Sequence, residues 1–415
     1  MIDVGELGPL WLLVAILTAT LAAAVATGRS TVPASVVLVV VGLVIALAGP
    51  DVGLPVPPSV LLAVVLPGLV FEAAFRTDPA VLRPVLVPVV VLAVPGVLIV
   101  AAIVGFVLSA MTSLSPTEGF LVGAMVAATD PAAVLSTFRR VAVPARLATL
   151  VEMESLVNDG TGIVLFGLAL ELLEGGGSIG GSILAFAVRV AGAAVLGAGL
   201  GWLAARLVHR VHDHLAELTL TVVLAYGTYL VAEALGLSAV IATLVAASAF
   251  GALARGGLSA RARDAIDVVW DFAAFLLTAG VFLLVGLSIA PETLVHAAGA
   301  IGLGILGVLV SRLVVVYGLL GAVPALIGRL SGRRLGAARS REPAVLRVPR
   351  AWLPVIFWAG LRGAVSVALA LSVPADLANR ELIQGVTFGI VLFTLIVQGA
   401  TAERVVRRSG ATSAA

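Results

Sequence analysis

The sequence predicts an all-α membrane protein that crosses the bilayer about thirteen times. Of its 415 residues, 61% are hydrophobic and only 12% are charged, whereas soluble domains carry roughly 25% charged residues. The apolar residues form runs close to the length of about 20 residues that a helix needs to span a hydrocarbon core. Apolar surface on this scale must leave water, and lipid is the environment that can receive it.

The candidate helices are apolar runs separated by polar residues or by glycine and proline. The run at 84–111 contains Pro84, Pro88 and Pro95 and is long enough to be tilted or broken, as is the run at 295–327. The first run lacks the basic flank of a cleaved signal peptide. In order, the predicted helices cover residues 8–27, 33–49, 58–75, 84–111, 117–136, 148–173, 181–208, 215–235, 237–254, 268–290, 295–327, 351–374 and 382–403.

The basic residues orient these helices, because positive residues are retained on the cytoplasmic side of a membrane. All of them are arginines, and the loops after even-numbered helices hold only Arg380. We therefore expect the N-terminus outside and the C-terminus inside. Loops after odd-numbered helices hold Arg29, Arg76, Arg83, Arg139, Arg140, Arg146, Arg206, Arg210, Arg255, Arg261, Arg263, the arginines from Arg329 to Arg350, Arg404, Arg407 and Arg408.

An odd number of helices with this charge bias permits two six-helix halves of opposite orientation, separated by one linker helix. Inverted repeats of this kind are a common transporter architecture, with substrate sites where broken helices meet at mid-membrane. The predicted organisation is one transmembrane domain over 1–408, with repeats at 1–175 and 215–405, a linker helix at 181–208 and a short cytoplasmic tail at 409–415.

Several classes of function are excluded by what the chain lacks. Cysteine and lysine are both absent, which removes disulfides, thiolate metal sites and the lysine of a Walker A nucleotide loop. The glycine run Gly175–Gly177 follows no strand and has no nucleotide-binding context. We expect a protein that is not an enzyme, needs no cofactor and binds no nucleic acid.

The fifth predicted helix carries a charge that needs a reason, because a charged side chain at the bilayer centre costs at least about 2.5–3.5 kcal/mol. Asp130 lies there between Thr129 and Pro131. Proline lacks an N–H group and disfavours helical geometry at the preceding residue, so we expect the helix to break. The freed carbonyls, the carboxylate and the hydroxyl form an all-oxygen environment that hard cations prefer.

The sixth predicted helix contains Glu154, Ser155, Asn158 and Asp159. Ser155 and Asp159 are four residues apart and share a side of the helix. Asp159 therefore presents a carboxylate beside a hydroxyl, close to Asp130 if these consecutive helices pack together. For Glu154 the simpler interpretation is a structural ion-pair partner.

Arg362 in the twelfth predicted helix is flanked by Gly360 and Gly363. The glycines suggest a second break, where a positive charge balances exposed helix C-terminal carbonyls. Arg312 and Arg189 also lie within apolar runs, and the sequence offers no role for Arg189.

Glu72 and Arg76 are four residues apart at the end of the third predicted helix. They can form an interfacial ion pair, or Glu72 can serve as an ion entrance. Asp271 most simply marks the cytoplasmic edge of the tenth predicted helix, with a role at an ion entrance as the alternative.

These residues resemble the monovalent cation/proton antiporters, specifically the sodium/proton exchanger branch that includes archaeal and bacterial NhaP proteins. The resemblance covers essentially the whole chain, with the motifs in order. A Thr-Asp-Pro triplet alone is a weak signal, but its combination with the Asn-Asp run is strong. The matching segments are Thr129-Asp130-Pro131, Glu154-Ser155-Leu156-Val157-Asn158-Asp159, Gly360-Leu361-Arg362-Gly363-Ala364, Phe71-Glu72-Ala73-Ala74 and Arg312.

The resemblance implies a role for each residue of the site. Asp159 is the essential carboxylate that takes either Na+ or a proton. Asp130, Thr129 and Ser155 complete the ion site, and Asn158 supports it. An Asn-Asp pair goes with electroneutral exchange of one cation for one proton, whereas two adjacent aspartates accompany electrogenic exchange.

The resemblance also implies that Glu154 pairs with Arg312, that Arg362 lies where the broken fifth and twelfth helices cross, and that Glu72 is a candidate cytoplasmic entrance. Members of this family are homodimers with an elevator-like movement of a core bundle. Sodium or lithium is the expected cation, with potassium as an alternative. An arginine-only, lysine-free composition favours a prokaryotic source and hence the inner membrane.

Three other functions compete with antiport. A cation channel needs a continuous pore with repeated ligands, whereas single aspartates on broken helices favour a carrier. An intramembrane hydrolase could use Asp130 and Asp159 as an acid/base pair, but no zinc-protease pattern or nucleophile elbow accompanies them. A transporter of organic anions needs more polar side chains than this compact oxygen cluster offers.

Overall fold

Every regular element in the described part of the chain is a helix, which confirms the predicted all-α class. The predicted helix 8–27, the arginine-rich stretch 328–350 and the end of the predicted tail lie largely or wholly outside the described residues. The computed structural model describes residues 34–48, 58–176, 178–211, 213–254, 256–289, 291–321 and 348–411, with scattered positions between 14 and 25.

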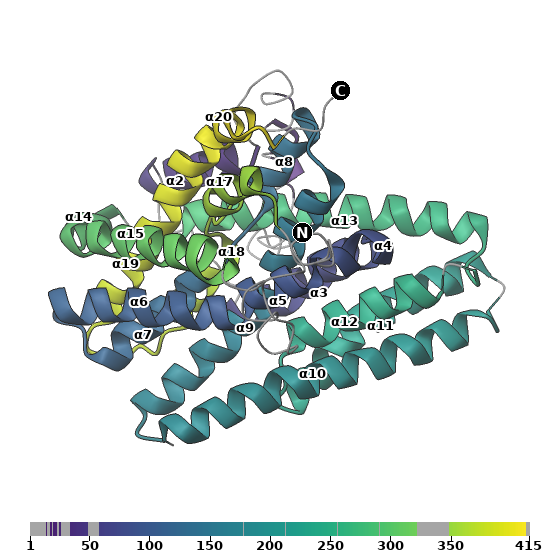
Figure 1. Ribbon diagram of the computed structural model, residues 1–415, viewed down its shortest axis with the longest axis horizontal. Helices are drawn as coiled ribbons and strands as arrows, with labels where there is room; N and C mark the ends of the chain where they lie inside the picture. Colours follow the sequence, from purple (N-terminus) through teal and green to yellow (C-terminus); the bar gives the residue numbers. More distant parts are fainter. Residues whose placement is uncertain are drawn as a thin grey trace, which may run out of the picture.

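One group of helices is built around α12 (Ala239–Leu253), which contacts α10 (Ile179–Val208), α11 (His214–Ala234) and α3 (Pro58–Arg76). In Figure 1, α10, α11 and α12 lie side by side in the lower right of the view. This group is completed by two helices that lie along each other, α2 (Ala34–Ala48) and α13 (Ala260–Leu287).

A second group contains the helices that carry most of the candidate site. Its longer members are α6 (Pro95–Met111), α7 (Pro116–Ala127), α9 (Ala145–Leu173), α15 (Ala298–Leu313) and α19 (Arg380–Phe393). Helices α6 and α7 contact each other, and α15 contacts both α6 and α19 on the left of Figure 1. The shorter elements are α4 (Pro79–Leu82), η2 (Arg83–Val85), α5 (Leu86–Ala93), α8 (Ala132–Arg140), α14 (Pro291–His296), η3 (Val314–Leu319), η5 (Arg350–Trp352), α17 (Leu353–Trp358), α18 (Ala364–Leu371), η6 (Thr394–Gly399) and α20 (Ala400–Ser409).

Few elements connect the two groups. Helix α9 contacts α12, α10 and α3, and α18 contacts α3 and α13. Because the predicted ion-binding residues lie on α9 and beside α18, the candidate site is located at the boundary between the groups.

Two helices are interrupted where the sequence predicts breaks. Between α7 and α8 the backbone at 128–131 is not helical, and Ala128 is extended. Between α17 and α18 the break covers 359–363. The proline-rich run 84–111 is also divided, because α5 ends at Ala93 and α6 starts at Pro95.

The tenth predicted helix differs from the structure at its start, since α13 begins at Ala260 and not near residue 268. The Ser259 side chain caps this end by accepting a hydrogen bond from the Ala262 amide. The polar residues before 268 therefore extend the helix, although their composition signals a loop.

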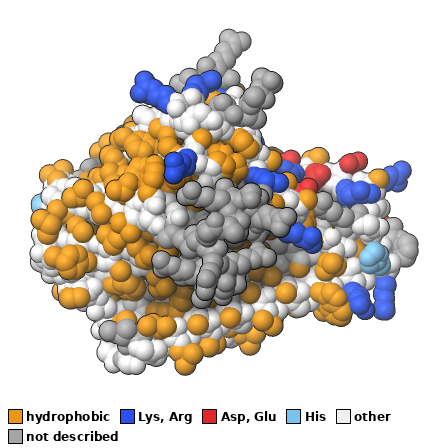
Figure 2. Space-filling view, viewed as in Figure 1, with side chains coloured by type: hydrophobic (Ala, Val, Ile, Leu, Met, Phe, Trp, Pro, Cys, Tyr) orange, Lys and Arg blue, Asp and Glu red, His pale blue; other side chains and the backbone are white. Residues whose placement is uncertain are grey.

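The surface is that of a multi-pass membrane protein. Large apolar side chains such as Val195 and Phe106 are 75% and 72% exposed, and Figure 2 shows hydrophobic side chains over much of the visible face, with charged side chains towards its upper and right edges. Among the described residues, eight helices are long and apolar enough to span a membrane. They are Pro79–Met111, Pro116–Arg140, Ala145–Leu173, Gly180–Val208, His214–Ala234, Ala260–Leu287, Ala298–Leu319 and Arg380–Ser409.

Candidate functional site

The two interrupted helices meet at Asp130. Its amide donates a 2.7 Å hydrogen bond to the Leu361 carbonyl, which ties one break to the other. A Cβ on Gly363 would lie 2.3 Å from Asp130 Oδ2, far inside van der Waals contact. Asp130-Pro131 interrupts the first helix. Because Gly363 has no side chain, the second interrupted segment can lie against the Asp130 carboxylate.

Arg362 stabilises this crossing from inside the protein, where it is 1% exposed. Its Nε donates to the Val126 carbonyl at 2.7 Å, and its Nη1 donates to the Gly360 carbonyl. These carbonyls lie at the C-terminal ends of α7 and α17, where a positive charge is favourable. The arginine therefore occupies the position that the glycine-flanked motif predicts. Thr394 accepts a 3.0 Å hydrogen bond from the Arg362 amide.

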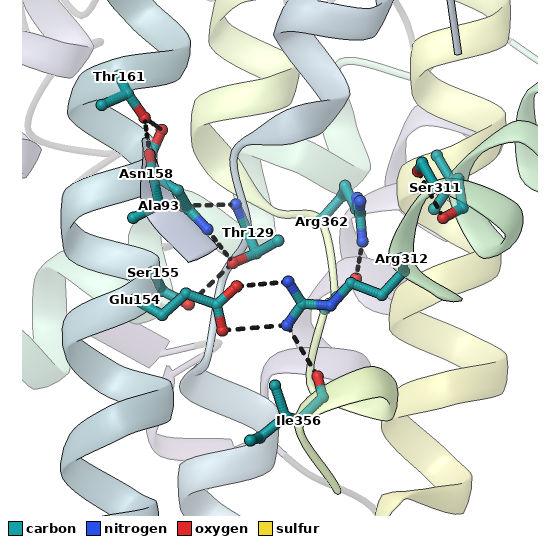
Figure 3. A network of polar contacts seen from close by, with 12 residues as sticks. Ala93, Thr129, Glu154, Ser155, Asn158, Thr161, Ser311, Arg312, Ile356 and Arg362 are labelled. Atoms are coloured by element: carbon teal, nitrogen blue, oxygen red, sulfur yellow. Dashed lines mark hydrogen bonds and ion pairs between the residues drawn. The ribbon is translucent and has the colours of Figure 1, made fainter. Parts of the chain in front are cut away.

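Asn158 holds the broken segment of the first helix against α9. Its Oδ1 accepts from the Thr129 amide at 3.0 Å, and its Nδ2 donates to the Thr129 hydroxyl at 2.7 Å. The Thr129 hydroxyl also lies 2.9 Å from the Ser155 hydroxyl, as Figure 3 shows. Both ends of the Asn158 amide are therefore used within the protein, which makes it a positioning residue. Thr161 extends the network by donating to the Ala93 carbonyl at 2.7 Å.

Asp130 and Asp159 line a single cavity of about 450 Å³. One carboxylate oxygen of Asp130 accepts from the Ala132 amide at 2.9 Å, at the start of α8. Within the described part of the chain, the Asp159 carboxylate has no hydrogen-bond or ion-pair partner and is partly exposed to the cavity. Thr129 lines the same cavity. A carboxylate without a partner, close to a second carboxylate and a hydroxyl, is suited to a small cation or a proton.

A buried ion pair lies behind the cavity. Arg312 contacts both carboxylate oxygens of Glu154, with Nη2 to Oε2 at 3.0 Å, and Nη2 also donates to the Ile356 carbonyl at 2.8 Å. Glu154 is 1% and Arg312 4% exposed. Figure 3 shows the pair joining α9 to the segment before the second break. The structure thus brings together the two residues that the family resemblance pairs.

The third-helix carboxylate, Glu72, lies 3.2 Å from Arg76 and also lines the cavity. Arg76 forms further ion pairs with Asp271 and with Asp267, the latter at 3.6 Å. The structure is therefore compatible with both interpretations of Glu72, as an ion pair and as a residue of the entrance. A more open hollow of about 540 Å³ adjoins Arg76 and Asp267 and contains neither Asp130 nor Asp159.

The structure shows an ion pair and two cavity-lining residues that the sequence did not reveal. Arg189 forms a 2.7 Å ion pair with Glu171, which connects α10 to the end of α9. Glu152 and Arg139 line the cavity although sequence reasoning did not select them. The signal for Glu152 was available: it precedes Asp159 by seven residues, which is close to two helical turns and hence the same face.

An all-helical membrane protein with a carboxylate pair where two interrupted helices cross has the architecture of a secondary ion transporter. The profile of the family described as "Sodium/hydrogen exchanger, transmembrane" matches residues 16–408, so the chain belongs to the sodium/hydrogen exchanger family. This confirms the family that the sequence motifs indicate.

Named relatives give the same assignment. The Na(+)/H(+) antiporter ApNhaP of Aphanothece halophytica is 37% identical over 387 residues, covering 91% of this chain and 70% of the relative. The Na(+)/H(+) antiporter NhaP of Pseudomonas aeruginosa is 34% identical, covering 84% and 81%. Because these relatives are antiporters, they confirm the expectation of a transporter and not an enzyme.

The fold has a solved counterpart in the sodium proton antiporter MjNhaP1 from Methanocaldococcus jannaschii. The two superimpose with a TM-score of 0.73 over 98% of this chain and 99% of that one, at 22% sequence identity. At this identity the likeness concerns the fold alone.

We predict that Gly363→Ala slows cation-driven proton movement in proteoliposomes by about tenfold or more, because its methyl group displaces the Asp130 carboxylate. Gly302→Ala is the matched control, since nothing lies within 4 Å of the added Cβ on α15. Equal rates for the two variants would contradict the role assigned to the close approach at Gly363.

We also predict that Glu154→Gln and Arg312→Gln each lower the free energy of unfolding by roughly 3–5 kcal/mol, because each leaves a buried charge without its partner. The free energy of unfolding of the double variant should fall by less than the sum of the two single losses. The more solvent-accessible pair of Glu403 and Arg407, with side chains 22% and 60% exposed, provides the control, and Glu403→Gln should cost at most about 1 kcal/mol. Unfolding in detergent measures these differences, and a Glu154→Gln protein as stable as Glu403→Gln would contradict the prediction.

Proposed function

We propose that this protein exchanges Na+ for H+ across the membrane, one for one, by alternating access. The observation that carries the proposal is Asp159: its carboxylate has no partner in the described structure, and it lines the same 450 Å³ cavity as Asp130 and Thr129. Li+ fits the same oxygen chemistry, and K+ is a larger alternative. The printed names of the relatives support sodium and protons as the two substrates.

Competition between Na+ and H+ for one carboxylate explains how the transport of the two ions is coupled. Burial disfavours a charged carboxylate, whereas a bound cation or a bound proton removes the cost. In this proposal, Asp159 with Na+ or with H+ crosses between the two sides, and empty Asp159 does not, because its charge would be uncompensated in a dry environment. Asp130, Thr129 and Ser155 supply the remaining oxygens for the cation.

The charges around the crossing favour a stoichiometry of one to one. Glu154 and Arg312 cancel each other as a buried pair. Arg362 has carbonyl partners but no carboxylate partner among the described residues, and in this proposal its charge offsets one of the two aspartates. A single negative charge remains, and one monovalent cation or one proton neutralises it.

The arrangement of the helices supports an elevator-like movement of one group against the other. Beyond Asp159, α9 approaches α12 closely: the Ser238 hydroxyl donates to the Gly160 carbonyl at 3.3 Å, and a Cβ on Gly160 would lie 2.7 Å from the Ile241 side chain. Neither Ser238 nor Ile241 lines the cavity. In this proposal the contact closes one side of the site while the cavity opens the other, and α9 slides along α12 during transport.

The remaining features of the organisation belong to the same proposal. They comprise thirteen helices in one domain, two inverted repeats, an outside N-terminus, an inside C-terminus, a homodimer in contact with lipid, and a prokaryotic inner membrane. The alternation of arginines supports the orientation, and the two breaks, one in each predicted half, support the repeats.

We predict that Asp159→Asn abolishes exchange. In sealed proteoliposomes with a pH-sensitive dye, sodium should dissipate a proton gradient with the wild-type protein and not with the variant, because the amide takes neither ion. Asp376→Asn makes the same chemical change at an exposed residue and should behave as wild type. Normal exchange by Asp159→Asn would remove the assigned site, and a wild type inactive with every cation would remove the proposed function.

A separate prediction concerns the electrical character of the exchange. If one net charge is neutralised per cycle by either ion, the initial rate should be the same with the membrane potential clamped at zero and with it left free. The comparison uses valinomycin with equal potassium on both sides. A faster initial rate with the potential clamped would show that net charge moves in each exchange and would contradict the charge balance.

A further inference from the structure

Glu152 is the carboxylate of the cavity that no proposed role yet uses. It lies on α9 seven residues before Asp159, so its Cα is about 10 Å from that of Asp159 along the helix and on the same face. Both residues line the 450 Å³ cavity, together with Leu156 between them. Glu152 and Asp159 therefore border the same space, about two helical turns apart.

The charges at this end of the cavity are not equivalent. Glu72 and Asp271 both form ion pairs with Arg76, so one arginine partly neutralises the two carboxylates. Asp130 accepts a hydrogen bond from the Ala132 amide. Glu152 has no ion-pair or hydrogen-bond partner among the described residues, and the charged groups that act on it from neighbouring helices are Glu72, Arg76 and Arg139.

We propose that Glu152 is a cation-attracting residue of the access path, which raises the occupancy of Asp159 by Na+ without binding the transported ion at the site itself. The inference rests on the proposed function. When ionised, the Glu152 carboxylate places a negative charge in a cleft with low-dielectric walls, which focuses the field and raises the local concentration of cations. At about 10 Å and an effective dielectric constant of about 25–80, removing that charge should weaken cation occupancy by about two- to tenfold.

This role predicts a specific kinetic pattern. Glu152→Gln should raise the half-saturating Na+ concentration about two- to tenfold at low ionic strength and leave the maximal rate close to that of the wild type. The difference should shrink when choline chloride is added, because the Debye length is about 10 Å at 0.1 M salt. Glu152→Asp keeps the charge and should keep the wild-type value.

The matched control is Glu174→Gln, which removes one negative charge from the other end of α9. Glu174 is exposed and does not line the cavity, so its half-saturating Na+ concentration should equal that of the wild type. A larger rise in Glu174→Gln than in Glu152→Gln would show that overall charge matters more than position, and would overturn the inference.

The absence of cysteine from the chain permits a test of charge alone. Glu152→Cys can be modified with a methanethiosulfonate reagent that carries either a sulfonate or a trimethylammonium group. The sulfonate should bring the half-saturating Na+ concentration back towards the wild-type value, and the ammonium should raise it further. Equal effects of the two reagents would overturn the inference, because a structural role depends on size and not on sign.

Two results keep this inference distinct from the proposed function. If the wild type moves no protons in response to any cation, the proposed function fails and the inference fails with it. If the wild type exchanges normally and Glu152→Gln has an unchanged half-saturating Na+ concentration, or loses maximal rate alone, only the role of Glu152 is overturned.

Discussion

Two interrupted helices cross inside an apolar bundle, and the backbone groups freed at that crossing must be satisfied by the protein because lipid cannot do so. The Asp130 amide bonds to the Leu361 carbonyl, and Arg362 donates to carbonyls at both helix ends. These contacts satisfy the Asp130 amide and three carbonyls, those of Leu361, Val126 and Gly360. Among the described residues, the Asp159 carboxylate beside this crossing has no hydrogen-bond or ion-pair partner, and it lines the cavity.

The electrostatic consequences extend outwards from the crossing. Glu154 and Arg312 form a closed pair that joins α9 to the segment before the second break, so they hold the geometry without adding net charge. In the proposed mechanism Arg362 offsets one aspartate, and the remaining negative charge is open to exchange. Asn158 fixes Thr129 with both ends of its amide, which keeps the hydroxyl near the carboxylates. The residues that fix the geometry of the crossing are therefore neighbours of those that carry the exchangeable charge in the proposed mechanism.

The sequence predicted the all-α class and the two breaks because proline and paired glycines act locally on the backbone. The start of α13 was misplaced, since a serine cap lets a helix continue through polar residues. Thr394 as the partner of the Arg362 amide could not be foreseen, because it depends on how distant helices pack. Glu152 was missed for a different reason: the motif drew attention to the residues after it, although helical periodicity placed it on the face of Asp159.

The central claim is that Na+ and H+ compete for one uncompensated negative charge at Asp159. The most direct measurement is the number of protons released per Na+ bound by the purified protein in weakly buffered detergent solution, followed by calorimetry and a pH electrode. At a pH at which the site is protonated, we expect one proton released for each Na+ bound, falling towards zero as the pH is raised. Binding of Na+ with no proton release at any pH, or with two protons released, would contradict the account.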